Sequence, residues 1–75
     1  MKYIKVKIEH QEQLIIFPKS IDHIAMARLI GKEVISAGFV SVGTDGMKVY
    51  GESYTLDLKS DVEKDQRLLD FMVEN

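Results

Sequence analysis

The stretch "VISAGFVSVGTDGMKVYGES", from Val34 to Ser53, holds four of the five glycines of this 75-residue chain among residues that favour strands. Asp45-Gly46 lies between two apolar runs and is a hairpin signal, so we expect "GTDG" to be a turn between two antiparallel strands. This turn accounts for Gly43 and Gly46. Gly38 and Gly51 fall inside the strand pattern, where a glycine usually marks a bulge or a close backbone approach.

Three small residues in a row, Ser36 to Gly38, predict a shallow place in the sheet. A bulge at Ala37–Gly38 would reset the alternation and let Ile35 and Val40 share a face. We expect a helix of the same chain to lie across these small residues. A partner or a ligand is the alternative occupant.

The segment before this stretch predicts a hairpin. "KYIKVKIE" alternates apolar and charged residues, as a half-buried strand does. "HQEQ" (His10 to Gln13) is a polar break, and "LIIFP" (Leu14 to Pro18) is apolar on both faces and ends at a proline. An antiparallel pair of strands is the simplest interpretation.

Two helices are expected from their capping signals. Ser20 is a good N-cap for "SIDHIAMARLIG", and Gly31 stands where a left-handed C-terminal residue is favoured. In "SDVEKDQRLLDFMVEN", Ser60 and Glu63 match the capping box at the start of an amphipathic helix.

These segments define one α+β domain over residues 1–75, in the order ββαβββα, or ββαββα if the strand after Gly46 does not break near Ser53. We expect a mostly antiparallel sheet with the two helices packed on one face. No repeat, linker or low-complexity tract interrupts the pattern.

Composition limits the ways in which such a short chain can be stabilised. It has no cysteine, which excludes disulfides and thiolate zinc sites and leaves a packed apolar core, with self-association as a way to extend it. The absence of cysteine is typical of a reducing compartment. No apolar run approaches the roughly 20 residues of a membrane span, and the N-terminus lacks a signal-peptide pattern. We expect a soluble, cytoplasmic protein without a membrane partner.

Charge argues against a nucleic-acid partner, because the net charge is −2 and the acidic excess lies in the C-terminal half. The alternative is a basic, aromatic strand face for RNA or single-stranded DNA, formed by Tyr3, Lys5 and Lys7. A competing interpretation is that Lys5 and Lys7 protect an exposed edge strand from pairing with other chains.

No catalytic, cofactor or metal residues are assigned. His10 and His23 are the only candidates for proton transfer at neutral pH, and neither has an evident acid or nucleophile beside it. Helix capping explains Asp61, Glu63 and Asp65 better than a calcium loop does. We therefore expect a protein that is not an enzyme, with a small enzyme as a remaining alternative.

Two features favour protein–protein contact instead. The segment from Leu14 to Phe17 is apolar on both faces, and tyrosine suits interfaces because it combines apolar area with a polar tip. We predict a contact surface of Ile15, Phe17, Tyr50 and Tyr54, used for an unknown protein partner or for a homodimer.

The segment from Ile35 to Asp65 resembles a group of small uncharacterised phage and prophage proteins. The shared pattern is a "SAGF" strand, a short hairpin, a "YGES" step, an alternating "xLxLxS" and an acidic residue that opens a helix, with weaker similarity in "IIFPKSIDH". The motifs carry no catalytic residue. The resemblance implies a mobile-element accessory protein that binds a host or phage protein, in the cytoplasm of the host cell.

Overall fold

The computed structural model describes residues 1–74 and has the expected α+β class. Its elements follow the predicted order ββαβββα, except that the last strand is split into two short pieces. They are β1 (Lys2–Ile8), β2 (Gln11–Phe17), α1 (His23–Ile30), β3 (Glu33–Gly43), β4 (Gly46–Tyr50), β5 (Glu52–Ser53), β6 (Leu58–Lys59) and α2 (Val62–Glu74).

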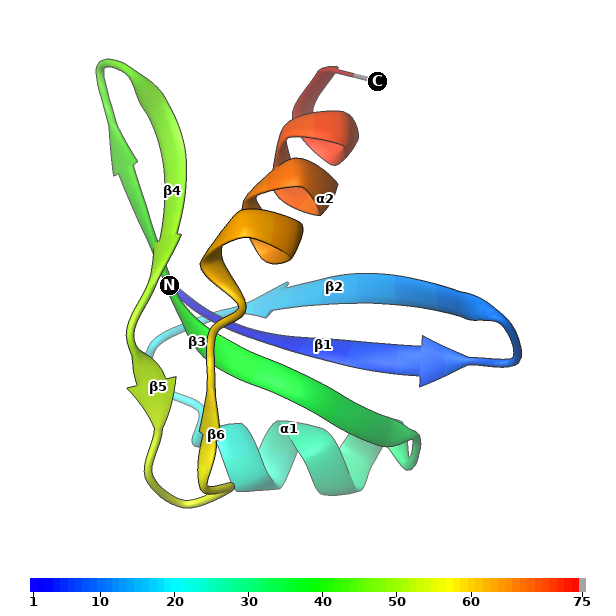
Figure 1. Cartoon of the computed structure of the whole chain (residues 1–75). Coiled ribbons are helices and arrows are strands. Elements are labelled where there is room, and N and C mark those ends of the chain that lie inside the picture. Colours follow the sequence, from blue (N-terminus) through cyan, green and yellow to red (C-terminus); the bar gives the residue numbers. More distant parts are fainter. Residues whose placement is uncertain (75) are drawn as a thin grey trace.

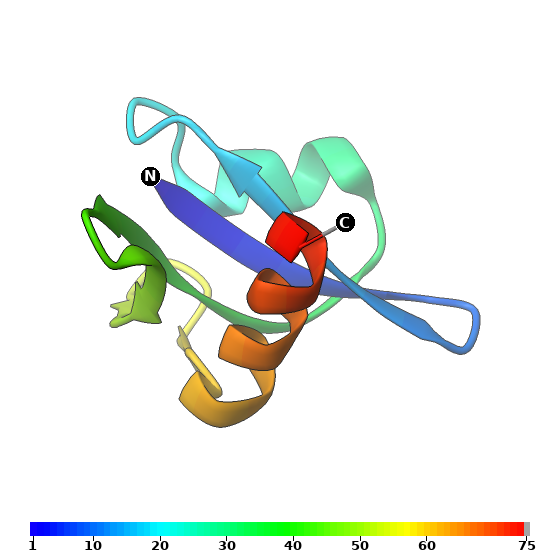
Figure 2. The ribbon, with the colours of Figure 1, turned by 90° about the horizontal axis from the view of Figure 1, so that it is seen from above.

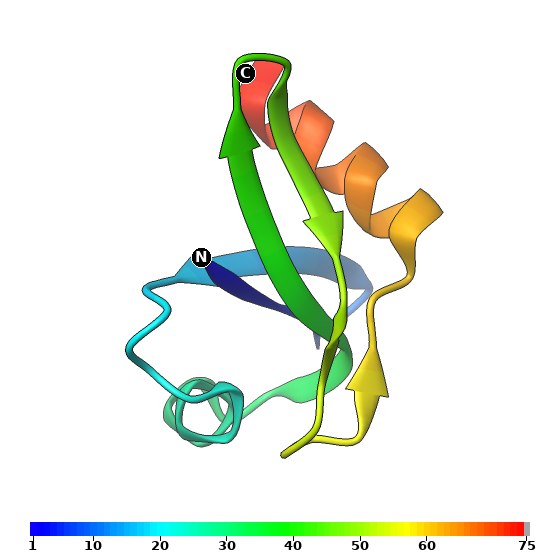
Figure 3. The same cartoon turned by 90° about the vertical axis from the view of Figure 1, so that its left-hand side faces the viewer.

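The main sheet has the strand order β2-β1-β3-β4, and each neighbouring pair is antiparallel. It curls, so that the β3–β4 hairpin rises beside α2 (Figures 1 and 3). β5 and β6 form a separate two-stranded sheet beside β3. Because β1 lies between β2 and β3, Lys5 and Lys7 are on a central strand and do not protect an edge, which corrects that interpretation.

Both expected hairpins are present. In the first, Ile8 pairs with Gln11, so the turn is Glu9–His10 and comes earlier than the polar break suggested. In the second, Gly43 pairs with Gly46 and Gly46 has a positive φ of 103°, which confirms the "GTDG" turn.

The two helices cover opposite faces of the sheet, which corrects the prediction that they share one face. Successive side chains of a strand point to opposite faces. Tyr3 packs in a buried cluster with Leu69 of α2, whereas Ile4 packs in a second cluster against which Met26 and Ile30 of α1 lie. Figures 1 and 2 show the sheet between the two helices.

Gly38 and Gly51, the two glycines outside the hairpin turn and the helix end, are both required by close packing. A Cβ at Gly38 would stand 2.5 Å from the carbonyl oxygen of Tyr50 and 3.1 Å from the Tyr3 ring. Gly51 has φ +78°, and a Cβ there would stand 2.9 Å from the Phe39 ring. Glycine therefore lets the chain after β4 cross closely over β3.

The row of small residues receives segments of the same chain, as expected. Ser36 bonds to Asp65 of α2, and Gly38 lies under Ser60, just before α2. Ala37 belongs to the cluster on the α1 face. The bulge itself is not at Ala37–Gly38: the register shifts so that Ile35 has no partner on β1.

The helix caps differ from the predictions at both N-termini. α1 begins after Asp22 and not after Ser20, and it ends as predicted at Gly31, with φ 69°. At α2 the capping residue is Asp61, whose Oδ1 accepts from the Lys64 amide, while Ser60 donates to the carbonyl of Gly51. The predicted Ser60–Glu63 box is therefore wrong, because Ser60 is used to tie α2 to the preceding loop.

Candidate functional site

A buried polar cluster joins α2 to the sheet. Oδ1 of Asp65 lies 2.7 Å from Nζ of Lys5, and Oδ2 accepts hydrogen bonds from Tyr3 (2.5 Å), Ser36 (2.8 Å) and the Asp61 amide (3.0 Å). Asp65, Tyr3, Lys5 and Ser36 are all buried. One carboxylate therefore holds together a helix, the central strand and the bulged strand.

These contacts set the ionisation of the cluster. Burial alone would raise the pKa of Asp65, but the hydrogen bonds from Lys5, Tyr3, Ser36 and Asp61 outweigh burial and hold the pKa below its usual value. Burial, followed by the hydrogen bond to Asp65, raises the pKa of Tyr3 strongly. At neutral pH the cluster thus contains an ionised aspartate and a neutral phenol.

The burial of this cluster corrects the predicted nucleic-acid face. Tyr3 and Lys5 are closed off by α2 and cannot reach a phosphate or a base, and only Lys7 of the three remains exposed. From the alternation of apolar and charged residues in β1, Lys5 is expected on a solvent-exposed face, but in the structure α2 covers that face.

The four residues predicted for protein contact are separated by burial. Ile15 and Phe17 face α1, where Ile15 is half-buried and Phe17 is buried edge-on to His23. Tyr50 and Tyr54 are 51% and 88% exposed, and a contact role for them stays a prediction. Ile15 and Phe17 do not form the exposed part of such a surface, because the second face of the sheet is also covered.

His23 is a core residue. Its Nε2 lies 2.8 Å from the carbonyl oxygen of Gly38, and its ring stands edge-on between Phe17 and Phe39. Phe39 in turn stacks on Tyr50. Within residues 1–74 no three His, Asp or Glu side chains lie close enough together to hold a metal ion.

The hydrogen bonds of Met1 identify which backbone groups face outward at the sheet edges. Met1 exchanges bonds with Val40 of β3, at 3.0 and 2.7 Å. In an antiparallel sheet, the backbone N–H and C=O groups of successive residues point to opposite neighbouring strands. The odd-numbered residues of β1 therefore form hydrogen bonds with β3, and the even-numbered residues form them with β2. The β2 partners of the odd residues therefore direct their N–H and C=O groups away from the sheet; they are Glu12, Leu14 and Ile16.

The two edge strands of the main sheet, β2 and β4, differ in whether their outward backbone groups have partners. At β4, the side-chain amide of Gln66 accepts from the Val49 N–H and donates to the Met47 carbonyl, both at 2.9 Å. Gln66 thus takes the place of a neighbouring strand. Within the described residues β2 pairs with β1 alone, so its outward row is an open edge.

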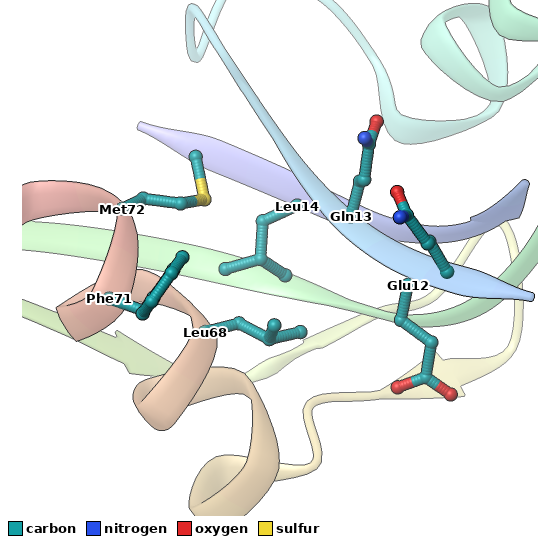
Figure 4. Close-up of a pocket in the computed structure, with 7 residues that line it drawn as sticks. Glu12, Gln13, Leu14, Leu68, Phe71 and Met72 are labelled. Carbon is teal, nitrogen blue, oxygen red and sulfur yellow. The ribbon is translucent and has the colours of Figure 1, made fainter. Parts of the chain in front are cut away.

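A groove of about 550 Å³ lies beside this open edge, between β2 and the C-terminal half of α2. Its residues are Gln11, Glu12, Gln13, Leu14, Leu68, Phe71 and Met72. Figure 4 shows Leu14 facing the side chains of α2, with Glu12 and Gln13 on opposite sides of the β2 ribbon. Phe71 is 67% exposed and Met72 is 46% exposed. This apolar groove, with an open strand edge along it, is the candidate functional site.

Only part of this site can be found from the sequence. Leu14 belongs to the apolar run that favours protein contact, but Leu68, Phe71 and Met72 belong to an amphipathic helix, whose apolar side is expected to be buried. No pattern in the sequence shows that Phe71 and Met72 stay exposed while Leu69 of the same helix is buried. No family model matches the chain, and no curated protein or solved structure is significantly similar to it.

No helix within residues 1–74 is long and apolar enough to cross a bilayer.

Proposed function

We propose that the protein is a small, non-enzymatic interaction module that acts by binding another protein through the groove between β2 and α2. One observation carries the proposal: two large apolar side chains, Phe71 and Met72, stay exposed beside an open strand edge. Exposed apolar surface next to unsatisfied backbone groups is typical of a protein contact site.

The rest of the molecule supports binding more than chemistry. Among the described residues, the cluster around Asp65 has the shifted pKa values, and it is closed to solvent: Oδ2 accepts three hydrogen bonds and Oδ1 is ion-paired with Lys5. His23 is held between two aromatic rings. A general acid or base must reach a substrate, and these groups face only the protein core.

The resemblance to phage and prophage proteins supplies the biological setting of the proposal. In that setting the protein is an accessory factor that works in the cytoplasm of a host cell and binds a host or phage protein. Self-association is the competing use of the same groove.

A matched pair of variants tests the proposal. Tagged wild-type chain, Met72→Ser and Val73→Ser are used to retain proteins from cells of the source organism, and each retained protein is then purified and its Kd measured. Val73 is 62% exposed on the same helix but does not line the groove, so it controls for loss of apolar surface and of helix propensity.

We expect a purified partner to bind wild type and Val73→Ser equally and to bind Met72→Ser at least about tenfold more weakly, because about 1.5 kcal/mol or more of apolar burial is lost. Equal binding by all three chains would contradict the groove as the contact site.

A further inference from the structure

We infer that the groove receives an extended segment of another protein, which pairs with β2 as an additional strand and places a basic residue opposite Glu12 and apolar residues opposite Leu14 and Ile16. This inference rests on the proposed function and specifies the conformation and the chemistry of the partner.

The open edge determines the conformation. Glu12, Leu14 and Ile16 present N–H and C=O groups to the outside, and an extended chain satisfies such a row with regularly spaced backbone hydrogen bonds. A helix in the groove would leave this row unpaired by the partner. At β4, Gln66 occupies the Val49 N–H and the Met47 carbonyl of the equivalent row, and α2 lies along this strand, so strand addition is directed to β2.

The side chains determine the pattern of the partner. Glu12, Leu14 and Ile16 pair with Lys7, Lys5 and Tyr3, so all three project to the face that α2 covers. An added strand would place alternate side chains on this same face. Its apolar residue beside Leu14 would enter the groove under Phe71 and Met72, which extends the buried cluster around Leu14.

Glu12 determines the charge of the partner. Its carboxylate is 45% exposed and lies 3.7 Å from Nζ of Lys5, whose charge is already matched by Asp65 at 2.7 Å. Within residues 1–74 Lys7, opposite Glu12 on β1, forms no ion pair with it. A basic residue on the added strand would lie beside the exposed part of the Glu12 side chain and give it a further cross-strand neighbour of opposite charge, on the side away from Lys5 and Lys7.

The same charge argues against a second copy of this chain as the occupant. The sequence of β2 is QEQLIIF, which contains no Lys or Arg. If two copies of β2 paired antiparallel with their Leu14 residues opposite each other, Glu12 of one copy would lie opposite Ile16 of the other. If the two Glu12 residues lay opposite each other, two carboxylates would be brought together. Neither register gives Glu12 a cation, so a different chain with a basic residue fits the edge better.

The test begins with selection of random ten-residue peptides displayed against the purified full chain. We expect the selected peptides to have apolar residues at every second position and a Lys or Arg two positions from one of them. Synthetic copies methylated at single amide nitrogens should lose about tenfold in affinity at alternate positions only, because each methyl removes one backbone bond to the edge.

Three substitutions at one site separate the edge from the charge. Glu12→Pro removes an outward N–H without removing a bond to β1, so the fold is retained, but it also removes the carboxylate. It is therefore compared with Glu12→Gln, which removes only the charge, and binding of the selected peptides should fall further, by about tenfold, in Glu12→Pro than in Glu12→Gln. Glu12→Lys should lower affinity for the basic peptides by about two- to fivefold and enrich acidic residues at the same position in a repeated selection.

The outcomes distinguish the two levels of the proposal. Selected peptides with helical spacing, or methylation that has no period-two effect, overturn strand addition while Met72-dependent binding still supports the groove. A dimer in light scattering that Glu12→Pro converts to a monomer shows that a second copy occupies the edge, which also overturns the inference. Absence of any binding that depends on Met72 removes the proposed function itself.

Discussion

Asp65 is the residue on which the seating of α2 depends, because it compensates the buried charge of Lys5. Asp65→Asn would leave that cation with only the more distant, partly exposed Glu12 carboxylate at 3.7 Å, and we expect the free energy of unfolding to fall by about 3–5 kcal/mol in urea denaturation. Asp45→Asn, in the exposed β3–β4 turn, is the matched control and should change stability by less than about 0.5 kcal/mol.

A 75-residue domain has little stability to lose, so Asp65→Asn could unfold it completely. Two further variants with smaller expected effects therefore test the same prediction. Tyr3→Phe removes only one hydrogen bond to Asp65 and should cost about 1.5–3 kcal/mol. Lys5→Met combined with Asp65→Asn removes both charges and should recover much of the loss. A double variant as unstable as Asp65→Asn alone would contradict the role assigned to Lys5.

The backbone of Tyr50 passes so close to Gly38 that there is no room for a side chain at this position. Gly38→Ala places a methyl group 2.5 Å from the carbonyl oxygen of Tyr50, and we expect a loss of about 1–3 kcal/mol in thermal or urea unfolding. Gly43→Ala is the matched comparison, since nothing lies within 4 Å of the position that its methyl group would take and its φ is ordinary. Similar stabilities for the two variants would refute the close crossing.

Individual residues show where sequence reasoning succeeds and where it stops. The left-handed end of α1 at Gly31 and the "GTDG" turn between β3 and β4 depend on neighbours in the chain, and the sequence predicts both. The burial of Lys5 depends on Asp65, which is 60 positions away in the numbering, and no local pattern reports such a pairing. Ser60 donates to the carbonyl of Gly51, nine positions earlier, and this use in place of a cap depends on how the intervening loop folds back.

At the scale of elements, Gln66 closes the edge of β4. Gln66→Ala removes both side-chain bonds to that strand, and we expect the Val49 amide to exchange its hydrogen about tenfold faster for each roughly 1.4 kcal/mol of protection lost. Native-state hydrogen exchange measures this directly. The Val40 amide, bonded to Met1, serves as the internal reference.

Asp70→Ala is the control for this variant, because it removes only the exposed bond between Gln66 and Asp70. Val49 exchange should then stay near the wild-type rate. If both variants accelerate Val49 equally, general fraying of α2 would explain the effect better than loss of edge closure.

The elements also explain why the sequence mispredicts the placement of the helices. β2 is apolar on both faces, which indicates a strand covered on two sides, and the structure supplies one helix for each side. The lysines of β1 favour the opposite prediction, because charged residues suggest that their face of the sheet is exposed to solvent. The candidate groove follows from the same arrangement, since the C-terminal half of α2 rises away from β2 beside the β3–β4 hairpin (Figures 1 and 3).

At the scale of the whole molecule, the lowered pKa of Asp65 makes stability depend on acid. An unfolded aspartate has a pKa of about 3.9, whereas folded Asp65 stays ionised to lower pH. As the pH falls below about 4, the unfolded chain binds the extra proton, so stability decreases until folded Asp65 itself is protonated.

Urea midpoints measured from neutral pH down to about pH 2.5 check this dependence. Wild type should lose more stability over this range than the Lys5→Met and Asp65→Asn double variant, which lacks the titrating group. Parallel curves for the two proteins would show that other carboxylates dominate the acid response.

The central position of β1 has a consequence for synthesis. Tyr3 and Lys5 of β1 are synthesised well before Asp65 of α2, which is their partner in the buried cluster. Until then one side of the strand is uncovered, and the nascent polypeptide cannot hold its final arrangement. Acquisition of the native state is thus delayed until translation has passed α2, which leaves an interval in which chaperones can engage the partly made chain.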